Sequence, residues 1–355
     1  MARMCRMQRA WADVEALTCS RTCRTRVVER DGTRVTEAAE WGRFQNAPMA
    51  PTFPALLRRM ARDVVVIHAP FPTGELSWLL ARPRARLVVR YHSDVVRQAA
   101  AMRIYGPFQR MFLQRADCIL PTSQQYLNTS PMLAAVRDRC RVIPLGIDTA
   151  AFDHPSEEGV AELRAKYGRY VLFAGRHRYY KGLRVLVEAA QGIRASVVAA
   201  GDGPERDACR RLAEERGVRM FFPGTLTHEE LVNHLHGCEA FVFPSVARSE
   251  AFGIALLEAH ACGKPAVATT LGTGVEFVNR HGETGLNAPP GDPRALAEAV
   301  NALLDDAAMR ERMGRTARER VRREFTMETV ARREFEVFEQ LMETGASANP
   351  APGDG

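Results

Sequence analysis

Two glutamates eight residues apart, Glu250 and Glu258, have the types and spacing to bind a ligand that carries hydroxyl groups. Residues 241–243 predict a short buried strand, and residues 251–262 predict a helix that ends at Gly263. One carboxylate then lies at the helix entrance and the other about two turns along, ~12 Å away by helical rise. Between them, the free N–H groups of the first helical turn favour an anion. Together these groups could bind a sugar nucleotide.

The alternative is an ordinary amphipathic helix with two solvated glutamates. The setting of the pair favours the binding site instead. An apolar strand precedes it, and the polar loop 244–250 lies at the carboxyl end of that strand. Ligands bind at this end of the strands in open α/β sheets.

A second candidate anion site is the loop 173–182. Gly175 allows a tight turn, and Arg176 and Lys181 project cations toward the helix that follows. Lysine is rare in this chain, with three residues against 46 arginines. A lysine in this loop therefore suggests a compact charge for phosphate oxygens. A solvated surface pair is the other interpretation.

The sequence predicts neither a metal nor a bound cofactor. No Asp-x-Asp pair is present that could hold a metal–diphosphate complex, and the eight cysteines form no Cys-x-x-Cys pair. The turn 199–204 lacks the third glycine of a dinucleotide fingerprint. We expect Arg176, Lys181 and helix N-termini to balance the charge of a departing diphosphate. Scattered, reduced cysteines also favour a cytoplasmic protein.

Strands alternate with helices along both halves of the chain, which predicts an α/β protein with parallel sheets and helices on both faces. The length of 355 residues suits two domains. We predict an N-terminal domain over 1–150, a C-terminal domain over 151–343 and a disordered tail over 344–355. The predicted strands are 26–28, 34–36, 63–69, 87–91, 118–120, 141–144, 170–174, 195–200, 220–222, 240–243 and 265–268.

The charge is uneven between the halves. Residues 1–150 hold 23 Arg, no Lys and 12 Asp and Glu, a net charge of +11, whereas residues 151–355 have a net charge of −4. A basic half suggests an anionic partner, such as phospholipid at the inner membrane face or a phosphorylated acceptor. Arginines that are simply solvated are the alternative. No nucleic-acid-binding motif accompanies the charge.

Several short motifs occur in an order that resembles family 4 glycosyltransferases (group 1), which are retaining enzymes of the GT-B fold. The resemblance is specific over about 141–325 and thinner before it. The motifs are Gly175-Arg176, Lys181-Gly182, Gly201-Asp-Gly-Pro204, Pro223-Gly224, Phe243-Pro-Ser245, the glutamate pair and Gly285-Leu286 with Pro289-Pro-Gly-Asp292. In the first half they are Tyr91-His-Ser-Asp94, Pro121-Thr-Ser123 and Ile143-Pro-Leu-Gly-Ile-Asp148.

The resemblance implies two Rossmann-like, doubly wound domains that face each other across a cleft. It assigns the donor diphosphate to Arg176 and Lys181, the transferred sugar to Glu250 and the ribose to Glu258. It also implies that His92 reaches the sugar from the opposite domain. The remaining donor-binding residues that it implies are Gly175, Thr225, Leu226, Thr227, Phe252, Gly253 and Ile254.

The implied function is a metal-independent, retaining glycosyltransferase that moves a sugar from a nucleotide-sugar donor to a hydroxyl acceptor. The acceptor could be lipid-linked or a cell-envelope glycan precursor, and a mannose-type donor is favoured. One departure supports a different hypothesis: residues 1–25 contain no convincing first strand with a Gly-Gly loop. A truncated, catalytically silent protein that binds nucleotide-sugar is therefore the alternative. A sugar-nucleotide epimerase suits the glutamate pair less well.

Overall fold

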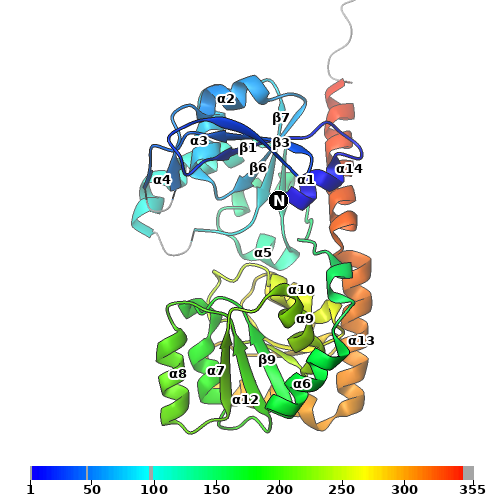
Figure 1. The fold of residues 1–355 in the computed structure, drawn as a ribbon. Coiled ribbons are helices and arrows are strands. Elements are labelled where there is room, and N and C mark those ends of the chain that lie inside the picture. The colour runs from blue at the N-terminus through cyan, green and yellow to red at the C-terminus, as the bar shows by residue number, and fades with distance from the viewer. Residues whose placement is uncertain (1, 45–46, 96–98, 347–355) are drawn as a thin grey trace, which may run out of the picture. The chain divides into compact units, whose positions relative to one another are not determined.

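The computed structural model describes residues 2–44, 47–95 and 99–346, which form two compact units (Figure 1). The first unit comprises Met1–Thr122, Ser130–Pro144 and Met327–Gly355, and the second comprises Ser123–Thr129 and Leu145–Thr326. The units thus divide at Pro144, near the expected boundary at residue 150. The last helix, which we assigned to the C-terminal domain, groups with the first unit. Of the expected tail, residues 344–346 are helical and the rest lie outside the described residues.

The first unit contains two three-stranded sheets, in the orders β1-β3-β2 and β6-β7-β8, and the small hairpin β4-β5. Its strands are β1 (Glu15–Cys19), β2 (Arg26–Arg30), β3 (Thr33–Ala38), β4 (Gly42–Phe44), β5 (Ala47–Met49), β6 (Val64–Ala69), β7 (Arg86–Tyr91) and β8 (Cys118–Pro121). Its helices are α1 (Ala2–Gln8), α2 (Phe53–Met60), α3 (Pro72–Ala81), α4 (Ala99–Leu113), the 3₁₀ helix η1 (Ala134–Arg139) and α14 (Met327–Ala346).

The predicted strands 26–28 and 34–36 are confirmed as part of a hairpin that turns at Asp31-Gly32. Strands β2 and β3 pair antiparallel up to Arg30 opposite Thr33, and both turn residues have positive φ, 50° and 74°. That conformation matches the two-residue turn that suits the twist of paired strands. Residues 1–25 do contain a strand, because β1 pairs parallel with β3 over its whole length, but no Gly-Gly loop follows it, since the first glycine of the chain is Gly32. The sequence of β1 is short and has polar flanks, so it does not predict a strand. The pairing with β3 makes this segment a strand.

The second unit is one parallel sheet of six strands in the order β11-β10-β9-β12-β13-β14. Its strands are β9 (Tyr170–Ala174), β10 (Ser196–Ala200), β11 (Met220–Gly224), β12 (Phe241–Phe243), β13 (Ala266–Thr269) and β14 (Gly285–Ala288). Its helices are α5 (Gln124–Thr129), η2 (Thr149–Phe152), α6 (Glu157–Tyr167), η3 (Tyr179–Lys181), α7 (Leu183–Ala189), α8 (Arg206–Glu215), α9 (His228–Gly237), α10 (Ile254–Ala261), α11 (Gly274–Val278), α12 (Pro293–Asp305) and α13 (Ala307–Glu324).

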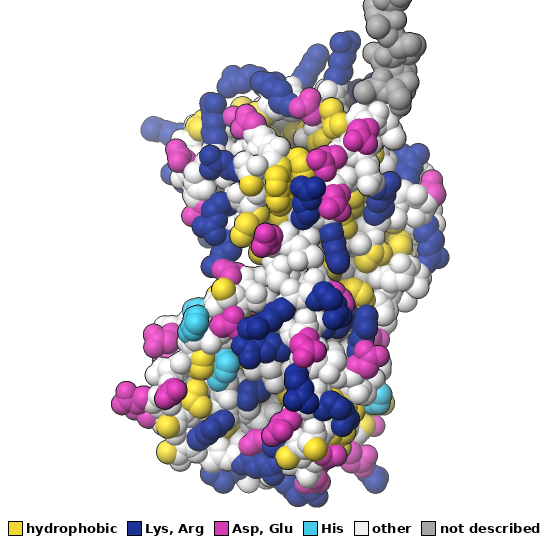
Figure 2. All heavy atoms as spheres, turned by 90° about the vertical axis from the view of Figure 1, so that its right-hand side faces the viewer, with side chains coloured by type: hydrophobic (Ala, Val, Ile, Leu, Met, Phe, Trp, Pro, Cys, Tyr) yellow, Lys and Arg dark blue, Asp and Glu magenta, His cyan; other side chains and the backbone are white. Residues whose placement is uncertain are grey.

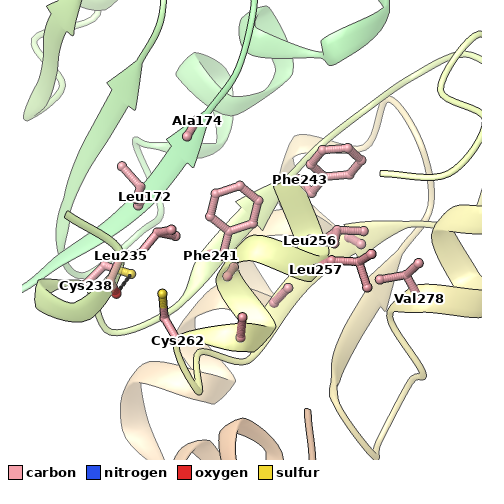
Figure 3. Close-up of a cluster of buried hydrophobic side chains, with 14 of the residues drawn as sticks. Leu172, Ala174, Leu235, Cys238, Phe241, Phe243, Leu256, Leu257, Cys262 and Val278 are labelled. Atoms are coloured by element: carbon pink, nitrogen blue, oxygen red, sulfur yellow. Dashed lines mark hydrogen bonds between the residues drawn. The ribbon is translucent and has the colours of Figure 1, made fainter. Parts of the chain in front are cut away.

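This strand order is that of a doubly wound fold, and it reverses direction between β9 and β12. Apolar side chains fill both faces of the sheet, because parallel strands are covered by helices on each side. On one face, Phe241 and Phe243 of β12 pack with Leu256 and Leu257 of α10 (Figure 3). The carboxyl ends of β9 and β12 therefore meet beside the first turn of α10.

Besides β1, the strands β4, β5 and β14 were not predicted, and one predicted strand is absent. Strand β14 was not predicted, because Gly285-Leu-Asn-Ala has neither alternation nor an apolar run; its pairing with β13 makes it a strand. Residues 141–144 form no strand, although Arg141 and Ile143 still donate backbone hydrogen bonds of 2.9 and 3.1 Å to β8. The other predicted strands lie within a few residues of observed ones.

A buried ion pair ties α14 to the first unit. Nε of Arg90 on β7 lies 3.2 Å from Oε1 of Glu334, and both side chains are almost fully buried. The other guanidinium nitrogens of Arg90 donate to the carbonyls of Ile143 and Pro144, and Gln8 of α1 donates to Glu334. Burial raises the pKa of Glu334, whereas the charge of Arg90 lowers it. The hydrogen bonds around this pair offset the cost of removing its charges from water.

Candidate functional site

The loops that follow β9 and β12 touch each other where the strand order reverses. The N–H of Val246 donates to the carbonyl of Tyr180 at 2.8 Å. Gly182 has a φ of 68°, and a Cβ added there would lie 1.8 Å from the carbonyl oxygen of Pro244. Only glycine allows this approach of the two backbones. The contact brings the predicted phosphate loop and the predicted sugar loop together.

Lys181 and Glu250 meet at this junction. Nζ of Lys181 lies 2.5 Å from Oε2 of Glu250, and little of either side chain is exposed. The ammonium group also lies 4.8 Å from the centroid of the Phe243 ring, and Ser245 donates to Glu250 at 3.2 Å. An ammonium group has three donors, so Lys181 can bind an anion while it holds Glu250.

Hydrogen bonds from Thr269 and Thr273 hold the backbone of the loop that carries Glu250. Thr273 Oγ1 donates to the carbonyl of Glu250 at 2.8 Å, and Thr269 Oγ1 donates to the carbonyl of Ser245 at 2.5 Å. The N–H of Gly274 donates to the carbonyl of Ala251 at 2.8 Å. These bonds hold the Glu250 carboxylate in one place, as preorganised binding requires.

The N-terminus of α10 lies directly after this loop. The helix begins at Ile254, three residues later than predicted, and Gly253 at the N-cap has a φ of 88° and no side chain to cap the first turn. Phe252 is buried, whereas Ile254 is exposed. The first-turn N–H groups of a helix attract anions. Phe252, Gly253 and Ile254, which the resemblance assigns to donor binding, thus lie at this helix terminus. At the other end of α10, Gly263, where the helix was predicted to end, has a left-handed conformation with a φ of 70°.

Glu258 lies one turn along α10, and it is partly buried. Burial raises the pKa of Glu258, while the charges of His228 and Lys181 lower it. His228 is the first residue of α9, directly after the Thr225–Thr227 turn.

The three residues of the Thr225–Thr227 turn have different surroundings. Thr225 is exposed and Leu226 packs against the hydrophobic core. Thr227 caps α9, since its hydroxyl accepts from the N–H of Glu230 at 3.2 Å and the Glu230 carboxylate accepts from its N–H at 2.7 Å. The side chain of Thr227 therefore has a structural partner, and contact with a base stays a prediction for this turn.

Arg176 and Gly175 follow β9 directly. Arg176 is exposed, and its carbonyl accepts from the N–H of Arg178 at 2.8 Å. A Cβ added to Gly201 would lie 1.9 Å from the carbonyl oxygen of Gly175, so the loop after β10 packs closely on this turn. Arg176 thus lies at the predicted edge of the sheet, and the loop after β10 packs against the backbone just before it.

His92 belongs to the first unit and follows β7. Its N–H donates to the carbonyl of Ala69 at 2.9 Å, and its Nε2 lies 2.8 Å from Nδ1 of His68. The rings stack with centroids 5.1 Å apart. Burial, and then the charges of His92 and Arg90, lower the pKa of His68 to about 3. Burial and Arg90 lower the pKa of His92 to about 4.

His68 is a candidate residue that the sequence analysis missed. It lies one residue before the end of β6, and β6 pairs in parallel with β7. Adjacent parallel strands end at the same edge of a sheet, so a histidine at this position was a usable signal.

Within residues 2–44, 47–95 and 99–346, the structure contains no group of three or more His, Cys, Asp and Glu side chains arranged to bind a metal ion. The loop after β9 carries the cations Arg176, Arg178 and Lys181, and the loop after β12 carries Arg248.

Two family models match the chain. The model described as "Glycosyl transferases group 1" matches residues 157–320, and the "Glycosyl transferase 4-like domain" model matches residues 1–146. O-antigen chain mannosyltransferase C of Escherichia coli is 38% identical over 284 residues, covering 79% of this chain and 76% of the relative. D-rhamnosyltransferase WbpZ of Pseudomonas aeruginosa is 40% identical over 266 residues, covering 74% and 70%.

Solved structures resemble the whole fold. Sucrose-phosphate synthase from Thermosynechococcus elongatus matches with a TM-score of 0.77 at 24% identity, covering 96% of this chain and 92% of that one. Anabaena HepE in complex with UDP-glucose matches with a TM-score of 0.73 at 19% identity, covering 92% and 99%. These likenesses show that the fold is GT-B, as expected.

Proposed function

The chain belongs to the group 1 glycosyltransferases of family 4, and from this premise we propose that it moves a manno-configured sugar from a nucleotide-sugar donor to a glycan hydroxyl, with retention of configuration. Two relatives are named for mannose and D-rhamnose, and D-rhamnose is 6-deoxymannose. HepE, which shares the fold, has been solved with UDP and with UDP-glucose. These names support the donor class.

The contact between Lys181 and Glu250 is the observation that carries the proposal. It joins a cation for the diphosphate and a carboxylate for sugar hydroxyls at the topological switch point, beside the uncapped N-terminus of α10. Glu258, one turn into α10, then binds the ribose diol. The donor extends along α10, with the transferred sugar at Glu250 and the ribose at Glu258.

In the proposed reaction, the bond between C1 of the sugar and the diphosphate oxygen breaks. The acceptor oxygen forms the new bond to C1 on the same face, and its proton passes to the departing diphosphate. Lys181, Arg176 and the N–H groups of α10 stabilise the negative charge that develops on the leaving group. Because these groups are cations and N–H donors, we propose that transfer needs no metal ion and no bound cofactor. The part of His92 in the reaction stays a prediction.

The proposed acceptor is a lipid-linked glycan, which would place the enzyme at the cytoplasmic face of a membrane. The relative named for the O-antigen chain supports a cell-envelope glycan. A catalytically silent protein that binds nucleotide-sugar is the second candidate, and the same experiment separates the two.

The test is a screen of GDP-, UDP- and dTDP-linked sugars for binding and for nucleotide release, with and without a chelator. Acceptors would be the same oligosaccharide, free and attached to a polyprenyl diphosphate. We expect transfer with a manno-configured donor, unchanged by the chelator, and NMR of the product should show the anomeric configuration of the donor. Binding without transfer supports the silent protein, and no binding to any donor contradicts both candidates.

A further inference from the structure

Helix α4 in the first unit exposes apolar side chains along part of its length, although it buries Phe112 and Leu113 at its C-terminal end. Gln109 is 1% exposed, and its side chain donates to the hydroxyl of Tyr105, which donates to the buried carboxylate of Glu75 on α3. In contrast, Ile104 is 76% exposed, and Phe108 is exposed as well. In a surface helix, apolar side chains ordinarily face the core, so the exposure of Ile104 and Phe108 departs from that pattern.

The exposed apolar residues of α4 share one face. Ile104, Phe108 and Met111 are spaced by four and three residues, so they form one stripe along the helix. Helix α3 packs against α4 (Figure 1), and it exposes Leu76 and Leu80, which also lie four residues apart. We call these five residues the α3–α4 apolar face.

The exposed charged side chains on α4 and directly after α3 and α4 are basic. Arg103, Arg110 and Arg115 are exposed on α4 and directly after it, and residues 99–115 contain no acidic residue. Arg82 and Arg84 are exposed after the end of α3. Elsewhere the charges are mixed: on the side of the second unit drawn in Figure 2, basic and acidic side chains lie among one another.

We propose that the α3–α4 apolar face docks on an anionic phospholipid bilayer. Ile104, Phe108 and Met111 would enter the interface, while Arg103 and Arg110 meet lipid phosphates. A second copy of this chain would bring arginines against arginines, which disfavours dimer formation at this face. Among the described residues, no helix is long and apolar enough to cross a membrane. An interfacial contact is therefore the form that membrane binding by this face would take.

The test is co-sedimentation of the full chain with vesicles of phosphatidylcholine alone or with a third phosphatidylglycerol. We expect binding to the anionic vesicles only. The partition coefficient should fall at least tenfold in Ile104→Ser/Phe108→Ser and in Arg103→Glu/Arg110→Glu. The matched control is Met342→Ser, which removes another exposed apolar side chain of this unit from α14 and should bind as the wild type does.

Circular dichroism of each variant shows that it is folded. Equal binding of the wild type and both double variants to the anionic vesicles overturns the proposal. It is also overturned if the wild type binds neither kind of vesicle. Light scattering that shows a dimer lost in Ile104→Ser/Phe108→Ser, without vesicle binding, would instead assign the face to a second copy. Because no donor or acceptor is present, a negative result leaves the proposed glycosyl transfer untouched.

Discussion

Nζ of Lys181 lies 2.5 Å from Oε2 of Glu250, although the two residues follow different strands of the second unit. The contact depends on the close approach of two backbones, Gly182 against Pro244. Lys181 therefore links two proposed subsites, one for the diphosphate and one for the transferred sugar. Loss of the lysine would remove the cation from the first subsite and the partner of the carboxylate in the second.

Replacement of Lys181 by alanine should lower kcat by about 10²–10³-fold, because a preorganised cation at the leaving group is lost. The unfolding free energy should also fall, since Glu250 stays buried without its cation. Steady-state kinetics and urea unfolding measure the two effects. Lys166→Ala is the control, because that lysine is exposed, and it should leave kcat within about twofold. Near-normal turnover in Lys181→Ala would contradict the assignment of the leaving-group site.

Alanine variants at two glycines with positive φ distinguish the effect of backbone strain from the effect of losing the contact between the loops. Gly182 has a φ of 68° and faces Pro244, whereas Gly282 has a φ of 81° with no atom within 4 Å of an added Cβ. Gly282→Ala should cost about 1 kcal/mol of stability from strain alone. Gly182→Ala should cost more and weaken donor binding, because its Cβ pushes the two loops apart. Urea unfolding measures the stability of each variant, and donor titration measures its affinity. If the two variants have equal effects, the contact between the loops at Gly182 does not contribute to donor binding.

The sequence predicted the repeated parallel architecture of the second unit well, since its strands are buried on both faces and read as apolar runs. Strand β9 has the predicted bounds, 170–174. The site was predictable for a related reason: Lys181 and Glu250 each follow such a strand, and strand ends meet at one edge. The contact between them depends on strand order, which local sequence does not encode.

Features defined by distant partners escaped prediction. Strand β14 exists through its pairing with β13, and α14 joins the first unit through Glu334 and Arg90, which are far apart in the chain. His68 was missed because its partner, His92, follows a different strand. In each case a long-range contact decides the structure, and local propensity is silent or misleading.

His68 should act as a positioning residue for His92. His68→Ala removes the ring that stacks on His92 and the hydrogen bond to its Nε2, which leaves the imidazole free to rotate. We expect kcat to fall about tenfold, as for a misplaced catalytic group, and nucleotide affinity to stay within about twofold. His92→Ala should lower kcat further.

The double variant His68→Ala/His92→Ala separates positioning from general damage. If His68 acts through His92, the double variant should be no slower than His92→Ala, since effects within one unit of function do not add. If the losses of kcat in the two single variants add in the double variant, His68 has only a structural role. The same conclusion follows if His68→Ala lowers nucleotide affinity as much as kcat.

The pH dependence of stability should reveal the buried His260 of α10. Burial, and then the charge of Arg320, lower the pKa of His260 to about 3. The unfolded chain therefore binds a proton near pH 6.5 that the folded chain does not, so this histidine costs stability as the pH falls below 6.5. Between pH 7 and pH 5 the cost reaches about 2 kcal/mol.

Replacement of His260 by leucine removes this linkage. Urea unfolding should show that His260→Leu loses about 2 kcal/mol less than the wild type between pH 7 and pH 5, whatever the variant costs at pH 7. Leu257→Val is the control, because Leu257 is buried in the same helix and has no titratable group. Its destabilisation should be the same at both pH values. If His260→Leu and the wild type lose equal stability on acidification, then His260 is protonated in the folded protein as readily as in the unfolded chain.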